Sequence, residues 1–235
     1  MQTMAGVGGV MKGITKPLVG IDQRAYWEAQ HERRAGEHFD LEGVPNQFAT
    51  RCVKIIPCGG RVVEIGPGYG RDARYFVRET SCQVVVVEIA KSALRQLGQA
   101  AVRDGTWRRI LPLARRVQDL RPADIGEVDA FYARSSLHLS NAELAMFLDL
   151  VDATLKPGGH LMIEGKTPTD PKIRRSFRVS DNLYSDHDGH VRRAWTEDGI
   201  RAFVSRMGYS LCTLGQSVEE WGGTSAHFIH CISRK

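Results

Sequence analysis

Three glycines stand directly after a short run of β-branched residues. The run is RVVEI at residues 61–65, and GPGYG follows at residues 66–70, ahead of residues that favour a helix. Glycine lets the backbone turn sharply and lets a ligand approach without a Cβ in the way. Ligands of open α/β sheets bind at the carboxyl ends of strands, where this turn is expected. The candidate binding residues of the turn are Gly66, Pro67, Gly68 and Gly70.

Three acidic residues are expected near the same edge of a sheet. Glu64 stands two places before the first glycine, and Glu88 lies near the end of the apolar run QVVVVEI. Asp119 stands near the end of residues 115–120, which we expect to form the third strand. A carboxylate beside the turn suits an ammonium group and poorly suits a pyrophosphate. The second acid can accept hydrogen bonds from ribose hydroxyls, and the third from an adenine amino group.

A nicotinamide dinucleotide is an alternative ligand. Its motif is G-x-G-x-x-G, which places the pyrophosphate at the helix N-terminus. Here the glycines form G-x-G-x-G, and Arg71 stands where the last glycine of that motif belongs. The spacing therefore argues against a nicotinamide-dependent dehydrogenase.

These residues resemble the Rossmann-like (class I) S-adenosylmethionine-dependent methyltransferases. EIGPGYG is similar to the first motif of that family, Glu88 to its ribose-binding acid and Asp119 to its adenine-side acid. LKPGGHLMIEG is similar to the segment that leads into its fifth strand. The resemblance implies S-adenosylmethionine as cofactor and S-adenosylhomocysteine as product. It also implies a seven-stranded sheet whose last strand is antiparallel.

The resemblance further implies where the parts of the cofactor lie. Gly66 and Gly68 line the methionine part, and Ile89 and Leu120 flank the ribose and adenine. Arg134 or Ser135 follows the fourth strand beside the sulfonium. The predicted function is transfer of the methyl group to an O or N nucleophile of a small-molecule substrate, such as a metabolite or natural product.

Two other functions are compatible with the same motifs. A methyltransferase of RNA or of a peptide fits the net charge of +5. However, ARSS at residues 133–136 lacks the N/D-P-P-[YFW] pattern that base-methylating relatives often have, so a nucleic-acid partner is not expected. A non-catalytic S-adenosylmethionine-binding protein is the other alternative, and the complete set of three acids argues against it.

Alternating strand and helix patterns predict the elements that position these residues. Strands are expected at residues 61–65, 83–89, 115–120, 128–133, 160–164, 209–217 and 226–233, and helices at residues 22–38, 45–56, 71–79, 92–103, 142–155 and 196–207. Asn141 is expected to cap its helix. Repeated βαβ units imply a parallel sheet with helices on both faces. We therefore predict an α/β fold with a doubly wound, mostly parallel seven-stranded sheet.

Two further segments are predicted outside this sheet. Residues 1–57 form an N-terminal arm and lid helices, and residues 58–235 form the methyltransferase domain. Within that domain, the polar stretch at about residues 166–195 breaks the alternation of strands and helices. It is predicted to be a cap, inserted after the fifth strand, that covers the substrate.

His138 is the first candidate for chemistry, because RSSLH leaves the fourth strand at the edge where the methyl group is expected. Methyl transfer needs an aligned nucleophile, and a general base where that nucleophile arrives protonated. A histidine that only caps the following helix fits the pattern equally well. The further catalytic candidates are Lys166, His31 and Tyr184.

Tyr26, Trp27 and His31 form a second group, on the first predicted helix. Trp27 and His31 are four residues apart and share a helix face. Related methyltransferases often close such a helix over the cofactor, and cation–π attraction gives an aromatic residue a reason to lie near a sulfonium. Tyr26 and Trp27 are therefore candidate cofactor-binding residues. An aromatic face packed on the core is the alternative interpretation of Trp27.

The predicted cap is rich in Arg, Lys and His. Its basic side chains can hold a carboxylate or phosphate of an anionic substrate, and a solvated basic surface explains the same pattern. DHDGH at residues 186–190 contains potential metal ligands, but a metal needs further ligands that the sequence does not place, and no metal site is predicted.

The composition favours a globular protein in a reducing compartment. Five cysteines without a C-x-x-C pair predict reduced, buried thiols. No apolar run approaches the length of a membrane span, and the first twenty residues lack the basic start of a signal peptide. We therefore expect a cytoplasmic monomer or homodimer with no membrane partner.

Overall fold

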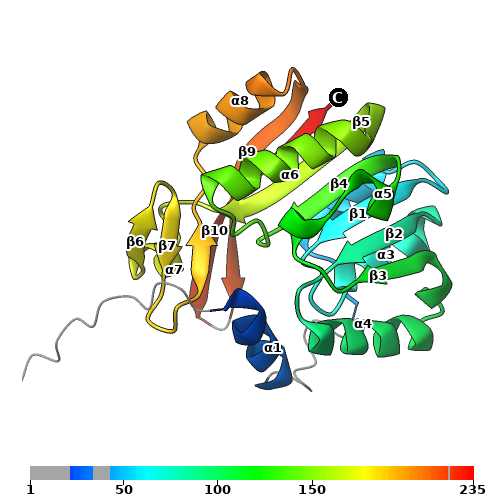
Figure 1. Ribbon diagram of the computed structural model, residues 1–235, viewed down its shortest axis with the longest axis horizontal. Helices are drawn as coiled ribbons and strands as arrows, with labels where there is room; N and C mark the ends of the chain where they lie inside the picture. The colour runs from blue at the N-terminus through cyan, green and yellow to red at the C-terminus, as the bar shows by residue number, and fades with distance from the viewer. Residues whose placement is uncertain (1–21, 34–42, 222) are drawn as a thin grey trace, which may run out of the picture.

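The computed structural model describes residues 22–33, 43–221 and 223–235. The predicted N-terminal arm and the end of the first predicted helix fall outside these ranges. A seven-stranded sheet with helices on both faces forms the centre of the molecule (Figure 1). In chain order its strands are β1 (Arg61–Ile65), β2 (Gln83–Val87), β3 (Ile110–Leu113), β4 (Val128–Arg134), β5 (Leu155–Lys166), β9 (Ser210–Trp221) and β10 (Thr224–Arg234).

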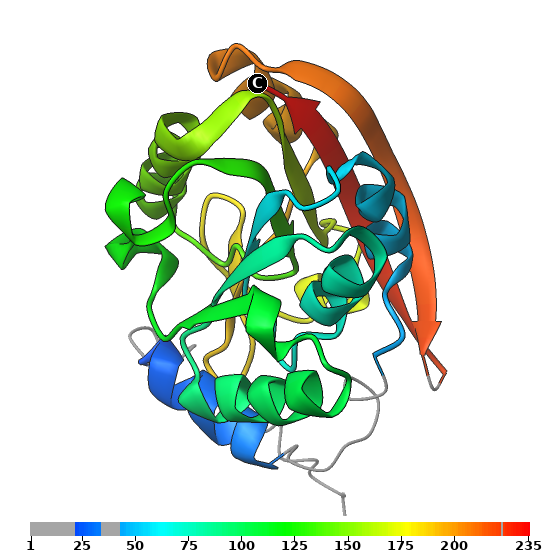
Figure 2. The ribbon, with the colours of Figure 1, turned by 90° about the vertical axis from the view of Figure 1, so that its right-hand side faces the viewer.

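The strand order across the sheet is β3-β2-β1-β4-β5-β10-β9. The first five of these strands pair in parallel, and β10 runs antiparallel to both β5 and β9. The predicted antiparallel last strand is therefore confirmed. The β9–β10 hairpin runs along one edge of the molecule (Figure 2). The helices are α1 (Gln23–Arg33), α2 (Gln47–Cys52), α3 (Arg71–Thr80), α4 (Lys91–Arg103), α5 (Pro122–Ile125), α6 (Asn141–Thr154), α7 (Pro171–Arg174) and α8 (Glu197–Arg206).

The central strands are buried on both faces because their side chains alternate between two apolar clusters. Val63 and Val85 belong to the cluster that includes residues of α6 and α8. Val62 and Val84 belong to the cluster that includes residues of α2, α3 and α4. This double burial explains why four valines follow one another in QVVVV, in place of the polar alternation of a half-exposed strand.

The predicted third strand is wrong in its position. β3 is Ile110–Leu113, and Val117–Asp119 forms a 3₁₀ turn. Pro112 argues against a central strand because proline cannot donate to a ladder, but β3 lies at the sheet edge, where proline is tolerated. Asp119 therefore ends a turn after β3 and not a strand.

The start of α6 also differs from the prediction. Ser140, and not Asn141, is the N-cap residue. The Glu143 N–H donates to Ser140 Oγ at 3.2 Å, and the Ser140 N–H donates to Glu143 Oε2 at 2.8 Å. This reciprocal capping box satisfies two backbone donors. His138 therefore precedes the cap and does not itself cap the helix.

After Lys166, which ends β5, the predicted cap leaves the large sheet until residue 195. It contains α7 and a separate antiparallel sheet of β6 (Phe177–Ser180), β7 (Leu183–Ser185) and β8 (Val191–Arg193). The helix α1 contacts this small sheet where Gln23 Nε2 donates to Gly189 O at 3.2 Å. It also contacts the start of α4, where the Ser92 N–H donates to Glu28 Oε1 at 3.0 Å. Thus α1 bridges two parts of the fold that are far apart in the sequence.

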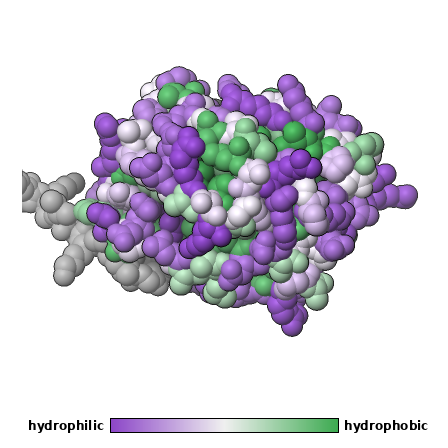
Figure 3. Space-filling view, turned by 90° about the horizontal axis from the view of Figure 1, so that it is seen from above, coloured by the Kyte–Doolittle hydropathy of each residue, from purple (hydrophilic) through white to green (hydrophobic). Residues whose placement is uncertain are grey.

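Seen from above, hydrophilic residues surround apolar residues grouped near the middle of the face (Figure 3). No helix within the described ranges is both long and apolar enough to cross a membrane. Cys52, Cys82 and Cys231 are buried as predicted, whereas Cys58 and Cys212 are exposed.

Replacing Gly70 by alanine should destabilise the fold strongly. Gly70 starts α3 at φ +71°, and a Cβ there would lie 2.4 Å from Leu97 Cγ in α4. The left-handed backbone costs about 1–2 kcal/mol for any L-residue, and the overlap adds about 1–3 kcal/mol. Gly105→Ala is the matched control, because Gly105 has φ +76° and open space around its Cβ position. Urea unfolding should show a clearly larger loss for Gly70→Ala, and equal losses would contradict the packing argument.

Candidate active site

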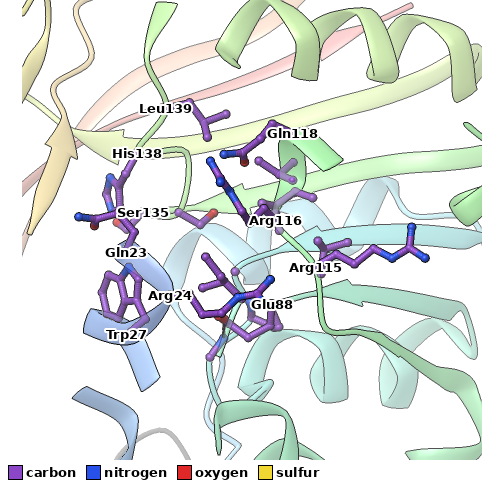
Figure 4. A pocket seen from close by; sticks show the side chains of 18 of the residues that line it. Gln23, Arg24, Trp27, Glu88, Arg115, Arg116, Gln118, Ser135, His138 and Leu139 are labelled. Carbon is purple, nitrogen blue, oxygen red and sulfur yellow. Dashed lines mark hydrogen bonds between the residues drawn. The ribbon is translucent and has the colours of Figure 1, made fainter. Parts of the chain in front are cut away.

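A cleft of about 580 Å³ lies at the carboxyl ends of β1, β2 and β4. The turns after these strands form one wall of the cleft. The rest of the lining comes from α1, from the segment after β3 and from the small sheet. Figure 4 shows Trp27, Gln118, Ser135 and His138 around the same space. The predicted site residues that line the cleft are Trp27, His31, Glu64, Gly66, Pro67, Gly68, Glu88, Ile89, Arg134, Ser135 and His138.

The turn after β1 adopts a backbone that favours glycine. Gly66 and Gly68 have φ values of +64° and +55°. A Cβ on Gly66 would lie 2.5 Å from Ser136 Cβ in the loop after β4. Gly68 has open space beside its Cβ position, apart from His31 at 3.9 Å. Gly66 therefore permits close packing of two loops, whereas Gly68 leaves its backbone accessible from the cleft.

The Glu88 carboxylate holds the glycine turn in place. Its Oε2 accepts from the Gly68 N–H at 3.3 Å, and its Oε1 accepts from the Ala90 N–H at 3.0 Å. Burial raises the pKa of Glu88, and the backbone N–H groups oppose that rise. The carboxylate therefore orders two turns while it lines the cleft.

Glu64 Oε2 is buried and has no hydrogen-bond partner within the described part of the chain. Burial, followed by the neighbouring Asp72 carboxylate, raises the pKa of Glu64 well above its ordinary value. A buried carboxylate oxygen without a partner costs free energy, which a bound cation would recover. The site beside Glu64 therefore suits a ligand with an ammonium group.

Asp72 is a second buried carboxylate at this end of the cleft. It accepts hydrogen bonds from the Asn46 N–H at 3.2 Å, from the Asn46 side-chain amide and from Tyr132 Oη at 3.0 Å. Arg71 Nε lies 3.6 Å from its Oδ1. Burial raises the pKa of Asp72, and Arg71 is the strongest opposing influence. No motif marks Asp72, because an acidic residue in the first turn of a helix is common for dipole reasons alone.

The end of β4 brings further polar groups to the cleft. Ser135 has φ +50°, an uncommon value for a residue other than glycine, and its N–H donates to Glu164 O at 2.8 Å. The hydroxyl oxygens of Ser135 and Ser136 are buried and lack hydrogen-bond partners within the described ranges. Two hydroxyls are thus available to a ligand at the place where the resemblance puts the sulfonium.

His138 lies in the cleft as a neutral side chain. Burial, then the nearby Arg192, lowers its pKa to about 3. Its Nδ1 accepts a long hydrogen bond from the Arg193 N–H at 3.4 Å, which places the ring proton on Nε2. A histidine with so low a pKa is a weak base. The low pKa therefore argues against His138 as a general base.

Aromatic rings connect α1 to the small sheet and to the cleft. Tyr26 stacks on His190 with centroids 5.0 Å apart, and Trp27 meets the same ring edge-on at 4.6 Å. His138 also meets His190, at 5.2 Å. Trp27 packs on the cluster that contains Tyr69 and also lines the cleft, and its role in cofactor binding stays a prediction. The sequence marks His190 only as a potential metal ligand in DHDGH, because nothing but the tertiary fold brings it to α1.

Six predicted site residues lie outside the lining of the cleft: Tyr26, Gly70, Asp119, Leu120, Lys166 and Tyr184. Leu120 is in the core, and Asp119 is exposed on the turn after β3, beside Gln118, which does line the cleft. Lys166 Nζ is 2.6 Å from Asp170 Oδ2 in an ion pair. The roles proposed for these residues stay predictions.

The basic side chains of the small sheet have partners inside the protein. Arg192 pairs with Asp186 at 2.6 Å, and Arg193 donates to Leu139 O and Asn141 Oδ1. The small sheet contributes Leu183 and Val191 to the cleft, and both are apolar. Within the described ranges, no group of three or more His, Cys, Asp or Glu side chains is arranged to hold a metal ion.

Comparison with known families identifies the domain. The family model described as "Methyltransferase domain" matches residues 62–159, from β1 to the start of β5. Residues 62–159 therefore form a methyltransferase domain. No curated protein matches the sequence of this methyltransferase.

Solved structures share its fold at low sequence identity. The 1,6-didemethyltoxoflavin-N1-methyltransferase of Burkholderia thailandensis is 19% identical, with a TM-score of 0.65 over 91% of this chain and 87% of that chain. The N-methyltransferase NodS of Bradyrhizobium japonicum is 17% identical, with a TM-score of 0.62 over 88% and 97%. A methyltransferase of Clostridium acetobutylicum is 13% identical, with a TM-score of 0.64 over 89% and 98%. At these identities the likeness shows the fold.

The cleft fits S-adenosylmethionine on the evidence of its own atoms. The buried, unpartnered Glu64 Oε2 matches the ammonium group, and the open backbone of Gly68 leaves room for the methionine part. Glu88 lies at the end of β2, where it can accept from ribose hydroxyls, and Val117 and Gln118 line the far end, where the adenine is expected.

Replacing Glu88 by alanine should weaken binding of S-adenosylhomocysteine roughly 100-fold, because it removes a carboxylate acceptor and loosens the Gly68 turn. Calorimetric titration measures the dissociation constant. NAD is the negative-control ligand for the wild type, and Glu79→Ala, exposed on α3, is the control variant. Equal affinity of Glu88→Ala and wild type, or binding of NAD, would contradict the assignment of the turn.

Replacing Glu64 by glutamine should stabilise the ligand-free protein while weakening cofactor binding. The pKa of Glu64 is higher in the folded than in the unfolded chain, so stability falls as pH rises between the two values. At about pH 8 the variant should gain about 1 kcal/mol or more, and at about pH 4 the gain should vanish. S-adenosylhomocysteine affinity should fall roughly tenfold. Chemical unfolding at both pH values measures the difference, and a loss of stability at both would refute the argument.

Proposed function

We propose that this methyltransferase transfers the methyl group of S-adenosylmethionine to an O or N nucleophile of a small-molecule substrate. The observation that carries the proposal is the composition of the cleft beyond the cofactor-binding turns. There Leu139, Leu183 and Val191 bring apolar surface next to Ser135 and His138. A cleft of about 580 Å³ that is covered by a small sheet fits a compact organic molecule better than a polymer.

The domain arrangement belongs to the same proposal. Residues 1–57 act as arm and lid, with α1 over the cofactor, and residues 166–195 act as the cap over the substrate. The contact of Gln23 with Gly189 and the stacking of Tyr26 on His190 support a lid and cap that close together. Residues 58–235 form the methyltransferase domain. The cytoplasmic location, the monomeric or dimeric state and an anionic substrate remain sequence-based predictions.

Bound S-adenosylmethionine supplies a methyl group on a sulfonium, which a nucleophile attacks in line. The protein contributes alignment, which can account for much of the rate. Ser135 and Ser136 offer hydroxyls at the end of β4, and His138 offers a neutral ring for hydrogen bonding to the substrate. Trp27 and the apolar residues of the small sheet keep water away from the transfer point.

The function is tested with metabolite extracts and isotopically labelled S-adenosylmethionine. Label should appear in a small molecule, detected by mass spectrometry, and not in RNA or protein fractions. Label found only in RNA or protein would show that the substrate is a polymer and contradict the proposed small molecule. Failure to label any fraction would count against catalysis.

Filling the substrate end of the cleft should separate substrate binding from cofactor binding. Val191→Trp places a large ring in the cleft, whereas Val179→Trp places one on the exposed side of the same small sheet. Val191→Trp should reduce transfer to the identified small molecule by about 100-fold or more while the affinity for S-adenosylhomocysteine changes less than about threefold. Parallel losses of transfer and cofactor affinity would show that Val191 does not face a separate substrate end.

A further inference from the structure

Two buried carboxyl groups lie at the end of the cleft where the glycine turn begins. Glu64 lies near the end of β1 and Asp72 in the first turn of α3, and both line the cleft. Each residue is less than a tenth exposed. Among the charged groups around Glu64, Asp72 has the largest effect on its pKa. Two like charges at close range in a buried environment repel strongly, so the two groups do not ionise independently.

Hydrogen bonds decide which of the two groups carries the negative charge. Asp72 accepts from the Asn46 N–H, from the Asn46 side-chain amide and from Tyr132 Oη, so both of its oxygens have donors. Glu64 accepts from the Ala73 N–H, and its Oε2 has no hydrogen-bond partner among the described residues. Donors to a carboxylate favour its ionised form. The charge therefore rests on Asp72, and the proton on Glu64, when the cleft is empty.

The other charged groups around Glu64 act in both directions. Arg71 in α3 lowers the pKa of Glu64, and Glu88 at the end of β2 raises it. Burial and repulsion by Asp72 outweigh Arg71, so the pKa of Glu64 stays well above its ordinary value. The further titratable or charged groups that act on this pair of carboxyls are Cys82, Tyr132 and Arg134.

We propose that Asp72 is a positioning residue for cofactor recognition, because its fixed negative charge keeps a proton on Glu64 until the ammonium group of S-adenosylmethionine displaces that proton. Binding breaks the O–H bond of the Glu64 carboxyl group, releases the proton to solvent and leaves a carboxylate paired with the ammonium. Asp72 acts through Glu64, since its own oxygens already have donors. The empty cleft thereby avoids two adjacent buried negative charges. The inference rests on the cofactor assignment above.

Cofactor affinity should therefore rise with pH. A carboxyl group that is protonated in the free protein and ionised in the complex must release its proton on binding, and that release is easier at higher pH. The rise ends above the pKa of Glu64 in the empty cleft. Removing the charge of Asp72 lowers this pKa, so the variant should reach its constant affinity at a lower pH.

Calorimetric titration with S-adenosylhomocysteine tests the proposal. Pairs of buffers with different ionisation enthalpies, at about pH 6 and about pH 8, give both the affinity and the number of protons released. The control ligand is 5′-methylthioadenosine, which has the ribose and adenine but lacks the ammonium. The variant Asp72→Asn removes the charge and keeps the size of the side chain. The matched control is Asp198→Asn, in the exposed first turn of α8.

At about pH 6, wild type and control should release about one proton with S-adenosylhomocysteine and none with 5′-methylthioadenosine. Their affinity for S-adenosylhomocysteine should rise at least about tenfold from pH 6 to pH 8, and the rise for Asp72→Asn should be about fivefold smaller. Glu64→Gln should bind the ligand without proton release, which gives an independent measurement if Asp72→Asn does not fold.

Three results would overturn the proposal. Asp72→Asn could lose affinity equally at both pH values with its proton release unchanged, which would make Asp72 a structural residue. Proton release with 5′-methylthioadenosine, or with Glu64→Gln, would show that another group titrates. Binding of S-adenosylhomocysteine by the wild type without proton release would refute the proposal and leave the cofactor assignment intact. Failure of the wild type to bind it at either pH would instead overturn the cofactor assignment itself.

Discussion

Close contact between the turn after β1 and the loop after β4 governs the arrangement of the cleft. These strands are neighbours in the sheet, so their loops leave it side by side. The contact requires Gly66, because any Cβ there would overlap Ser136. It holds Ser135 in a left-handed backbone and directs the loop along the cleft. On the other side, the Glu88 carboxylate holds Gly68. The cleft is the space that these two constraints leave at the carboxyl ends of β1, β2 and β4.

A second general feature is that several acidic side chains are buried, and the neighbouring cations and hydrogen bonds do not fully offset the cost of burying their charge. Burial raises the pKa values of Glu64, Asp72, Glu88 and Glu164. Each of these groups reduces the stability of the ligand-free fold at neutral pH. Such groups are typical of functional sites, where a ligand supplies what the protein lacks. The ligand-free methyltransferase is therefore electrostatically incomplete, and a ligand with an ammonium and a sulfonium has the complementary charge.

The sequence best predicts the structural elements that depend on residues close together in the chain. β1, β2 and the glycine turn follow from double-sided burial and local backbone freedom, so their positions agree with the structure. The sequence predicts the third strand at the wrong residues because Pro112 argues against a strand at Ile110–Leu113. It also predicts Asn141 as the helix cap, one residue after the observed cap Ser140. Asp72, His190 and Glu219 could not be predicted. Glu219 is 85 positions from its partner Arg134, and no local pattern reports a contact of that range.

The order of the strands has a consequence for how the chain folds. Among the strands described, β9 pairs only with β10, although the chain makes β9 first. It therefore cannot join the sheet until β10 has formed beside β5 or the two arrive together as a hairpin. Since β9 supplies Glu219, the ion pair between Glu219 and Arg134, which lines the cleft, forms only after β9 has joined the sheet. A chain in which only β1 to β5 are paired would contain the glycine turn but not the ion pair of Arg134 with Glu219. The topology thus delays a complete site until the whole sheet is assembled.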